Sequence, residues 1–484
     1  MARYDIELRQ IGEYCWEVPR FDEMNVPARV FANADLLEAI KSDNALDQAI
    51  NVAFLPGIVR ASYAMPDAHW GYGFPIGGVA AFDPDNDGVI SPGGIGYDIN
   101  CGVRLVGSDL DADEVKDRIQ EVAGSLYQEV PCGVGSSGAI KRLSKSDLRK
   151  VMVNGAAWAV ENGMGREDDL LRTEAGGAME GADPDQVSSK AVKRGQPQVG
   201  TLGSGNHFLE VDVVDEVFDD SAARTFGVEK GGIVFQIHCG SRGFGHQICK
   251  DFLDVMRNAT KKYGLNPPDK QLCCAPINSD EGRRYFGAMV AGANFAWCNR
   301  QVIFSMVVKA LEKVFVGDRD SMGIQQIYDV CHNIAKFEEH DVDGEKRRLC
   351  VHRKGATRAF PPGHPEVPEP YRDIGQPVLI PGDMGTCSYL LCGNEKSMSE
   401  TWGSTCHGAG RVMSRKGAKR KGKGRNLLEE MKQRGVVVKA RGMGTVAEEM
   451  PYAYKDVESV VSVMHNAGIT RRVARLKPLA VVKG

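Results

Sequence analysis

A carboxylate and a thiol lie three residues apart in the glycine-rich segment 91–104, where Asp98 precedes Cys101. Glycine permits the tight turn that would aim both side chains in the same direction. A carboxylate and a thiolate at this spacing can share a metal ion, and thiolate sulfur can also bridge two ions. The segment therefore predicts part of a metal site.

Three histidines further along the chain would complete such a site. His207, His238 and His332 each lie near Gly, Asn or Ser. A lone histidine at a strand end is typically structural, but three in similar settings favour ligands. Together with Asp98 and Cys101 they suit a borderline divalent ion such as Mn, Zn or Co. Five donors are too many for one tetrahedral zinc with an open position, and they suit two ions that share the thiolate, as in phosphoryl transfer.

His407 has a different setting. Small residues follow it at 408–410, and segment 411–425 then carries eight basic side chains and no acid. An imidazole nitrogen can attack an activated phosphorus and form a phosphoramidate, but the residues alone favour a metal-ligand or structural role for His407. The basic segment is either a solvated surface or, because it follows His407 directly, a contact for a phosphate backbone.

The composition limits the classes of partner and location. The chain has 484 residues and a net charge of -4, so any nucleic-acid contact must come from a local patch rather than from a global basic field. Its 13 cysteines have no regular spacing, and the first residues lack the apolar core of a signal peptide. These features favour a reducing, cytoplasmic location. No run of about 18 apolar residues is present, so we expect no membrane span.

The elements that must position these side chains mix helices and strands without a regular alternation. Apolar spacings of three and four predict helices over 113–130, after His246 and over 285–315, the last of them a buried core helix. Asp456 is a predicted N-cap of a further helix that ends before Gly468. Strand-like runs occupy 232–237, 346–351 and 376–380.

Two segments look loose: a loop-rich insertion at about 164–199 and the basic segment 411–425. Glycine clusters recur along the chain and indicate either ordinary turns or loops that meet at one ligand. We expect a single large α+β domain over residues 1–484, with sheets and helices around a central cleft for metal and nucleotide.

The motifs occur in a recognisable order. Segments 65–78, 91–104, 203–210, 238–245, 332–336, 352–358, 381–391 and 407–410 closely resemble the RtcB family of tRNA-splicing ligases, and the resemblance extends to residues 482–484. It implies a GTP- and Mn(II)-dependent RNA ligase for tRNA splicing and RNA repair. RNA ends with a 2′,3′-cyclic phosphate or 3′-phosphate would be joined to 5′-hydroxyl RNA ends through a guanylated histidine and an activated RNA 3′-end.

The resemblance also implies roles for single residues. Asp98, Cys101 and His207 would hold one Mn(II), and Cys101, His238 and His332 would hold the other. His407 would be the guanylated nucleophile. The implied GTP contacts are Asn206, His207, Phe208, Leu209, Glu210, His332, Asn333, Pro381, Gly382, Asp383, Met384, Ser388, His407, Gly408, Ala409, Gly410, Tyr454 and Lys483.

Two of these positions carry a specific expectation. Glu210 would accept hydrogen bonds from guanine N1–H and N2–H₂, a donor pair that adenine lacks; the alternative is a surface residue on a strand. Asp383 departs from the family pattern, in which some members have a hydroxyl or another small residue. Because a carboxylate repels phosphate, we expect any contact there through backbone N–H groups.

Contacts to RNA are expected from Arg242, Lys354 and Arg358, and from Lys419, Arg420 and Lys421 in the basic segment. Related systems use an activating partner called archease, and the resemblance makes it a candidate partner here. Two other functions stay open on the residues alone: a metal-dependent phosphodiesterase or end-processing hydrolase, and a non-catalytic RNA-binding subunit with structural metals.

Overall fold

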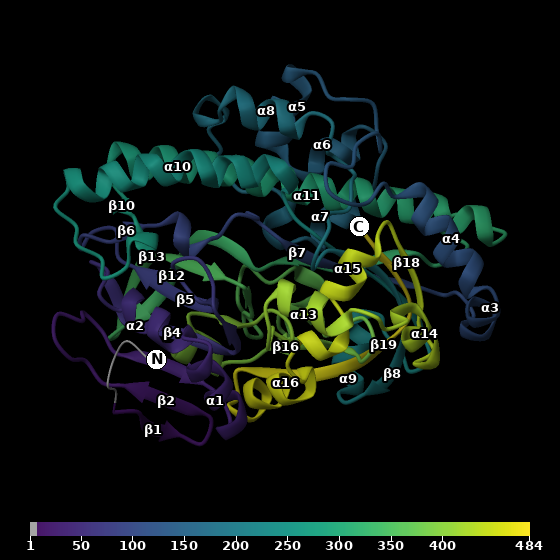
Figure 1. Cartoon of the computed structure of the whole chain (residues 1–484). Coiled ribbons are helices and arrows are strands. Elements are labelled where there is room, and N and C mark those ends of the chain that lie inside the picture. The colour runs from purple at the N-terminus through teal and green to yellow at the C-terminus, as the bar shows by residue number, and fades with distance from the viewer. Residues whose placement is uncertain (1–6) are drawn as a thin grey trace.

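The computed structural model describes residues 7–484, whose strands form two large sheets (Figure 1). The first sheet has the strand order β1-β2-β3-β4-β5-β13-β12. These strands span, in that order, Arg9–Gly12, Cys15–Val18, Ala28–Phe31, Ile58–His69, Ile76–Phe82, Glu345–Lys354 and Asn333–Val342. All its neighbours are antiparallel except the pair β3 and β4.

The second sheet has the order β11-β7-β9-β8-β19-β16-β15, with β18 beside β19. These strands span Gln325–Cys331, Gly102–Ser108, Ile233–Cys239, Phe208–Val217, Thr470–Lys483, Ser388–Gly393, Pro377–Ile380 and, for β18, Val437–Ala440. Two short pairs join β6 (Val89–Ile90) to β10 (Ala275–Pro276) and β14 (Ala356–Arg358) to β17 (Ser404–Cys406). The short pair β14 and β17 brings the chain just before His407 against the chain that follows β13.

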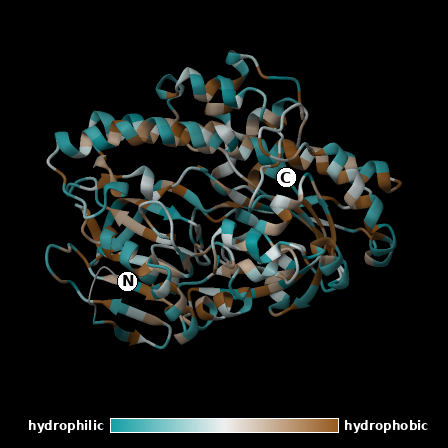
Figure 2. Ribbon diagram, viewed as in Figure 1, coloured by the Kyte–Doolittle hydropathy of each residue, from teal (hydrophilic) through white to brown (hydrophobic). Residues whose placement is uncertain are grey.

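Two long helices, α10 (Arg242–Lys262) and α11 (Asp280–Val314), lie along one side of the sheets, at the top of Figure 1. On their outer side pack α5 (Lys145–Asn154), α6 (Ala156–Glu161) and α8 (Ser189–Gly195). Teal and brown alternate along α10 in Figure 2, as expected for a helix with one apolar side. Helix α11 is buried over most of its length, which confirms the predicted core helix.

The remaining helices are short. They are α1 (Ala34–Ser42), α2 (Ala45–Val52), α3 (Ala112–Asp117), α4 (Ile119–Glu129), α7 (Glu167–Leu171), α9 (Asp220–Phe226), α12 (Lys396–Thr401), α13 (Arg415–Gly422), α14 (Leu427–Gln433), α15 (Met443–Glu448) and α16 (Val457–Asn466). The mixture of helices with mostly antiparallel sheets confirms the predicted α+β class.

Several local predictions are confirmed. Asp456 accepts from the backbone N–H groups of Glu458 and Ser459 and caps α16, and Gly468 just beyond the helix has a φ of 78°. The three predicted strands correspond to β9, β13 and β15. All thirteen cysteines are free thiols, as expected from their irregular spacing.

Other predictions are wrong in detail. The helix predicted over 113–130 is broken at Arg118, whose φ of -103° and ψ of 12° separate α3 from α4. The basic segment 411–425 is not loose throughout, because Ser414 caps the helix α13 within it. The insertion 164–199 contains α7 and α8, and its Asp169 and Glu174 are almost fully buried. Among residues 7–484, no helix is both long and apolar enough to cross a membrane.

Candidate active site

A cavity of about 1260 Å³ has walls from both large sheets. Its lining brings together the loop after residue 94, the start of β8, the ends of β9 and β11, the loop after β15, the segment after β17 and the end of β19. These segments are spread over nearly four hundred positions. The predicted central cleft is therefore present, and both sheets contribute to it.

Neighbouring strands of the second sheet carry the predicted metal donors to one edge. Cys101 directly precedes β7, His238 lies near the end of β9, His207 directly precedes β8, and His332 directly follows β11. These strands are adjacent in the order β11-β7-β9-β8, with Val103 opposite His238 and Phe208 opposite His238 in the antiparallel registers. Strand pairing alone therefore places the four side chains at one edge of the sheet.

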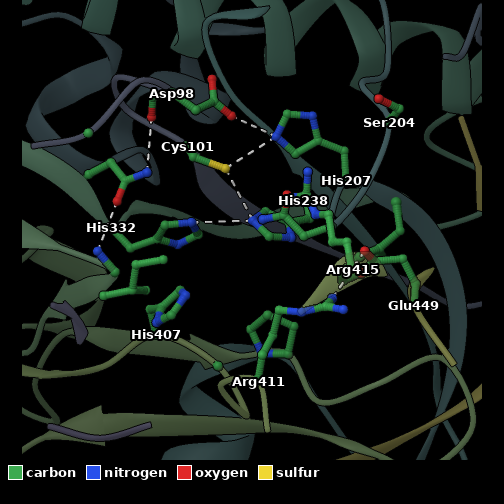
Figure 3. A pocket seen from close by; sticks show the side chains of 18 of the residues that line it. Asp98, Cys101, Ser204, His207, His238, His332, His407, Arg411, Arg415 and Glu449 are labelled. Carbon is green, nitrogen blue, oxygen red and sulfur yellow. Dashed lines mark hydrogen bonds and ion pairs between the residues drawn. The ribbon is translucent and has the colours of Figure 1, made fainter. Parts of the chain in front are cut away.

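The donor cluster, defined as Asp98, Cys101, His207, His238 and His332, forms two groups that share one atom. Cys101, His238 and His332 make one group, Asp98, Cys101 and His207 make the other, and the ligand atoms within each group lie within 4.8 Å of one another. Cys101 Sγ lies 3.3 Å from Nε2 of His207 and 3.3 Å from Nε2 of His238 (Figure 3). The thiol is therefore placed to bridge two ions.

The charges in the donor cluster favour added cations. Burial and the Asp98 carboxylate raise the pKa of the Cys101 thiol to about 12, so the sulfur keeps its proton unless a cation replaces it. Burial opposes ionisation of Asp98, but His207 outweighs it and lowers the pKa of Asp98 to about 2. His207 Nε2 lies 2.7 Å from Asp98 Oδ2, so a proton now holds together two groups that a metal ion would otherwise bind.

His238 and His332, in the other group of the donor cluster, carry no positive charge. Burial lowers the pKa of His238 and of His332 well below the usual range, so both rings are neutral. Their Nε2 atoms are only 3.3 Å apart, and Nδ1 of each ring is buried without a hydrogen-bond partner. A divalent ion would satisfy the facing lone pairs. Thiolate, imidazole and carboxylate donors fit a transition metal of the Mn or Zn type.

A buried ion-pair cluster, formed by Arg104, Arg300 and Asp329, holds the backbone next to the donor cluster. Arg300 on α11 donates to both oxygens of Asp329, and also to the backbone carbonyls of Asn100 and Cys239 at 2.7 and 2.8 Å. Asn100 directly precedes Cys101, and Cys239 directly follows His238. One guanidinium therefore fixes the backbone beside two members of the donor cluster.

His407 follows β17 and lies beside the donor cluster, with its ring centroid 4.8 Å from that of His332 (Figure 3). Asp67 on β4 fixes it: Oδ2 accepts from the backbone N–H of His407 at 3.0 Å and lies 2.6 Å from its Nδ1. Gly355, with a φ of 59°, faces the same ring, and a Cβ there would come within 3.1 Å of Cε1. Nδ1 is thus engaged, and Nε2 is the nitrogen left for chemistry.

Asp67 was not singled out by the sequence, although it lies in the motif 65–78. Its carboxylate is fully buried. Lys455 donates to the backbone carbonyls of Pro66 and Ala68 on either side, at 3.1 and 2.6 Å. Burial lowers the pKa of Lys455 to about 8 while Asp67 opposes the shift. The only sequence signal was the motif itself, because the partner of Asp67 is 340 positions away.

Seventeen of the eighteen expected nucleotide contacts line the cavity, and Leu209 is the exception. Leu209 is fully buried because side chains alternate along β8, so its neighbours Phe208 and Glu210 face the cavity instead. The side chain of Leu209 therefore does not line the cavity, and the expected GTP contact of this residue stays a prediction. The Asp383 carboxylate accepts from Gly385 N–H and from the Thr386 hydroxyl, both at 2.9 Å, so it is bound within its own loop.

Glu210 lies on the cavity wall rather than on the outer surface, and its side chain is almost fully buried. Burial and the neighbouring Asp212 raise its pKa well above the usual range, while Lys483 opposes that shift. Gln236, opposite Glu210 on β9, donates to Asp212 at 2.6 Å and to Glu210 at 3.4 Å. The alternative of a solvent-exposed strand residue is excluded.

Further cavity residues were not predicted individually. Arg411 and Arg415 line the cavity from the start of the basic segment, and Glu449 lies beside them (Figure 3). Arg411 is 3.2 Å from Glu449 Oε1 and 3.2 Å from the Tyr454 hydroxyl. Arg194 also lines the wall. The sequence signal for Arg411 and Arg415 was the basic segment 411–425, which does not show which of its members face the cavity.

The residues expected to bind RNA differ in their position relative to the cavity. Arg242 and Lys354 line the cavity, but Arg242 already donates to Thr201, Gly133 and Ser136, and Lys354 to the backbone carbonyls of Tyr72 and Phe74. Lys419, Arg420 and Lys421 lie on the exposed side of α13, outside the cavity lining.

Arg358 corrects the third expectation. Its side chain is 1% exposed and pairs with Glu174 and Glu366, and it does not line the cavity. A guanidinium enclosed by two carboxylates has no free face for a phosphate. Its role in the fold is structural.

Fold and site together describe an α+β protein in which a histidine lies beside a cluster of side chains that could hold metal ions. The chain belongs to the RtcB family: a family model described as tRNA-splicing ligase RtcB matches residues 48–484.

Relatives match almost end to end. A tRNA-splicing ligase RtcB of Archaeoglobus fulgidus is 57% identical over 479 residues, which cover 99% of each chain. That of Thermococcus kodakarensis is 55% identical over 480 residues, again 99% of each chain. An RNA-splicing ligase RtcB of Mycobacterium bovis is 50% identical over 438 residues, 90% of this chain and 100% of that one.

Proposed function

We propose that this chain is a GTP- and Mn(II)-dependent RNA ligase that joins 2′,3′-cyclic phosphate or 3′-phosphate RNA ends to 5′-hydroxyl ends, in tRNA splicing and RNA repair. Membership of the RtcB family supports the reaction class. The observation that carries the mechanism is the position of His407, which is held through Nδ1 by Asp67 beside the donor cluster.

In the first step, Nε2 of His407 attacks the α-phosphorus of GTP. A P–N bond forms, the P–O bond to the β-phosphate breaks, and pyrophosphate leaves. The Asp67 carboxylate accepts the Nδ1–H, which keeps the lone pair on Nε2 and stabilises the positive charge that develops on the ring. A histidine without this partner would lose both orientation and charge stabilisation.

In the next steps, an oxygen of the RNA 3′-phosphate attacks the phosphorus on His407, and the P–N bond breaks to give an RNA 3′-end capped with GMP. The 5′-hydroxyl oxygen of the second RNA then attacks the 3′-phosphorus, and GMP leaves with its bonding pair. A cyclic end is first opened by water to the 3′-phosphate. The cap provides the leaving group that a phosphate monoester lacks.

Asp98, Cys101 and His207 would hold one Mn(II), and Cys101, His238 and His332 the other. Such ions supply neutralisation of phosphate charge and orientation for in-line displacement. The residues themselves keep neutral imidazole donors available at His238 and His332, because burial lowers the pKa of both rings.

Guanine selection is assigned to Glu210. Its carboxylate, when ionised, accepts from both N1–H and N2–H₂, and adenine would leave it buried without donors. Lys483 opposes the effect of burial on the pKa of Glu210 and favours the ionised form. Tyr454 and the other cavity residues from the expected set complete the nucleotide site, with Asp383 contributing through its loop backbone.

RNA would approach through Arg242 and Lys354 at the cavity and Lys419, Arg420 and Lys421 on α13. We further propose that residues 1–484 act as one ligase domain in the cytoplasm, with archease as a candidate activating partner.

Incubation with labelled GTP and Mn(II) tests the proposal. The expected result is an acid-labile, base-stable label on the protein that is absent from His407→Ala, together with RNA joining by the parent alone. Opening of cyclic phosphate without any protein label would indicate an end-processing hydrolase. Joining by His407→Ala would exclude His407 as the nucleophile.

A further inference from the structure

An exposed aromatic ring marks one rim of the cavity. Trp70 lies in the turn between β4 and β5, lines the cavity, and is 58% exposed. Large apolar rings that face solvent beside a reaction site are typical of binding surfaces. Neither the donor cluster nor the nucleotide contacts use this ring.

The backbone around Trp70 is fixed although its ring is not covered. Its N–H donates to both carboxylate oxygens of Asp43, at 2.9 and 3.0 Å. Gly71 is bound on both sides by the buried Gln48 of α2, which accepts from its N–H at 2.9 Å and donates to its carbonyl at 2.7 Å. The ring is therefore presented from a rigid turn, so binding there orders little additional chain.

More aromatic rings line the same cavity. Tyr72 and Tyr97 meet edge to face with centroids 5.8 Å apart, and Tyr97 stacks on His246 of α10 at 4.9 Å with an interplanar angle of 27°. Trp70, Tyr72, Tyr97 and His246, here called the aromatic track, all line the cavity. Tyr97 directly precedes Asp98 of the donor cluster, so the backbone that carries this ring leads into the donor cluster.

Cationic groups accompany the track. Arg194 lines the same cavity, and the Arg257 guanidinium lies against the Tyr72 hydroxyl while it also pairs with Asp254. Rings that stack on bases together with cations that meet the backbone are the combination that binds single-stranded nucleic acid. Unpaired bases at RNA ends are the groups most available for stacking.

We propose that the aromatic track binds unpaired nucleotides next to one of the two RNA ends, with Trp70 stacking on a base. This inference rests on the proposed function only in taking the cavity as the site where RNA ends react. Stacking accepts any base, so the track would select unpaired ends over duplex ends without selecting a sequence.

The test compares Trp70→Ala and Trp70→Phe with the parent. The matched control is Tyr263→Ala, because Tyr263 is also an exposed aromatic residue but lies outside the cavity lining. Fluorescence anisotropy measures binding of three RNAs: a single-stranded 3′-phosphate oligonucleotide, a single-stranded 5′-hydroxyl oligonucleotide and a blunt duplex. Protein labelling by GTP without RNA is measured in parallel, and KM and kcat are measured for joining.

Trp70→Ala should weaken binding of at least one single-stranded oligonucleotide about tenfold and raise its KM by a similar factor, as expected for the loss of one base stack. Protein labelling, kcat and blunt-duplex binding should stay at the parent level. Trp70→Phe should retain most of the affinity, and Tyr263→Ala all of it.

Binding of both single strands within twofold of the parent would overturn the proposal, and so would an equal loss for the blunt duplex. The proposed function fails separately, if the parent takes no label from GTP. In that case the oligonucleotide measurements would still decide whether the track binds RNA.

Discussion

Two buried polar clusters are connected through Arg300 in this molecule, and they differ in how their charges are balanced. The ion-pair cluster of Arg104, Arg300 and Asp329 is 0% exposed, and Asp329 accepts from both guanidinium groups at 2.8 to 3.1 Å. In the donor cluster, by contrast, neutral imidazole nitrogens face one another, and two Nδ1 atoms have no partner. Opposite charges that pair with each other stabilise a fold, whereas a thiol and neutral imidazoles that face one another are placed to hold a cation.

The largest expected effect is on the donor cluster. Cys101→Ser should remove bound Mn(II) and reduce protein labelling by GTP at least about a thousandfold, because Sγ is the only donor that both groups share. Metal content by mass spectrometry and labelling with GTP measure the two effects.

Without metal, the free energy of unfolding of Cys101→Ser should be close to that of the parent, because Sγ of the metal-free parent binds no cation. EDTA should accordingly lower the Tm of the parent but not of the variant. Cys298→Ala, at a buried thiol on α11 away from the cavity, is the control and should keep its metal. Full metal content and labelling in Cys101→Ser would show that the thiol does not bridge.

The ion-pair cluster should respond in the opposite way. Asp329→Ala leaves two buried guanidinium groups without their carboxylate and should reduce the free energy of unfolding by about 3–5 kcal/mol, whether or not Mn(II) is present. Urea unfolding measures this change, and Asp329→Asn serves if the alanine variant does not fold.

Asp185→Ala is the matched control, because the Asp185–Arg149 pair is exposed on both sides. Its effect on the free energy of unfolding should be within the error of the urea measurement, because solvent screens an exposed pair. If Mn(II) restored the stability of Asp329→Ala to that of the parent, the contribution of the ion-pair cluster to stability would not be independent of metal binding.

Glu174, a buried and paired carboxylate, should make the free energy of unfolding depend on pH. Burial alone would raise its pKa, but Lys336, Arg358 and the backbone N–H of Cys331 outweigh burial and lower it to about 2. A carboxyl with a depressed folded pKa stabilises the protein above its ordinary value of 4.5, and that contribution is lost as pH falls from about 4.5 to 2. Over this window the loss should be of the order of 3 kcal/mol.

Glu174→Gln should therefore flatten the dependence of the free energy of unfolding on pH between about pH 5 and pH 2, relative to the parent. Urea unfolding at a series of pH values measures both slopes. Identical slopes in the parent and in Glu174→Gln would mean that the group is not held ionised by its partners.

The donor cluster was predictable from the sequence and the ion-pair cluster was not. Asp98, Cys101 and the histidines have side chains with few other uses together, and they occur in motifs of a known family. Arg300 and Asp329 are ordinary charged residues whose meaning depends on which strands flank α11. Asp67 illustrates the same limit, because its importance comes from its interaction with His407, 340 positions away.

The errors in the predicted site and fold also have physical reasons. Arg358 had the residue type of a phosphate contact, but β14 directs it into an ion pair with Glu174. Leu209 lies within a motif whose alternate residues face the cavity, and strand geometry turns its side chain away, so its expected GTP contact stays a prediction. The break at Arg118 falls inside an unbroken apolar pattern, since periodicity shows which side of a helix is buried and not where its backbone leaves helical geometry.

The smallest effect is expected where charges are neither buried nor near the reacting groups. Lys419, Arg420 and Lys421 are exposed on α13, and Lys419 already lies 2.7 Å from Glu448. Replacing all three by Gln should weaken RNA binding and reduce the slope of log affinity against log salt by up to about 2, because each phosphate that is no longer neutralised accounts for about 0.7 of the slope. Labelling by GTP should not change, which separates this surface from the donor cluster.

Lys141, Arg142 and Lys145, also exposed and outside the cavity lining, provide an equal charge change as the control. If the α13 variant kept the salt slope of the parent, α13 would be a solvated surface and not an RNA contact.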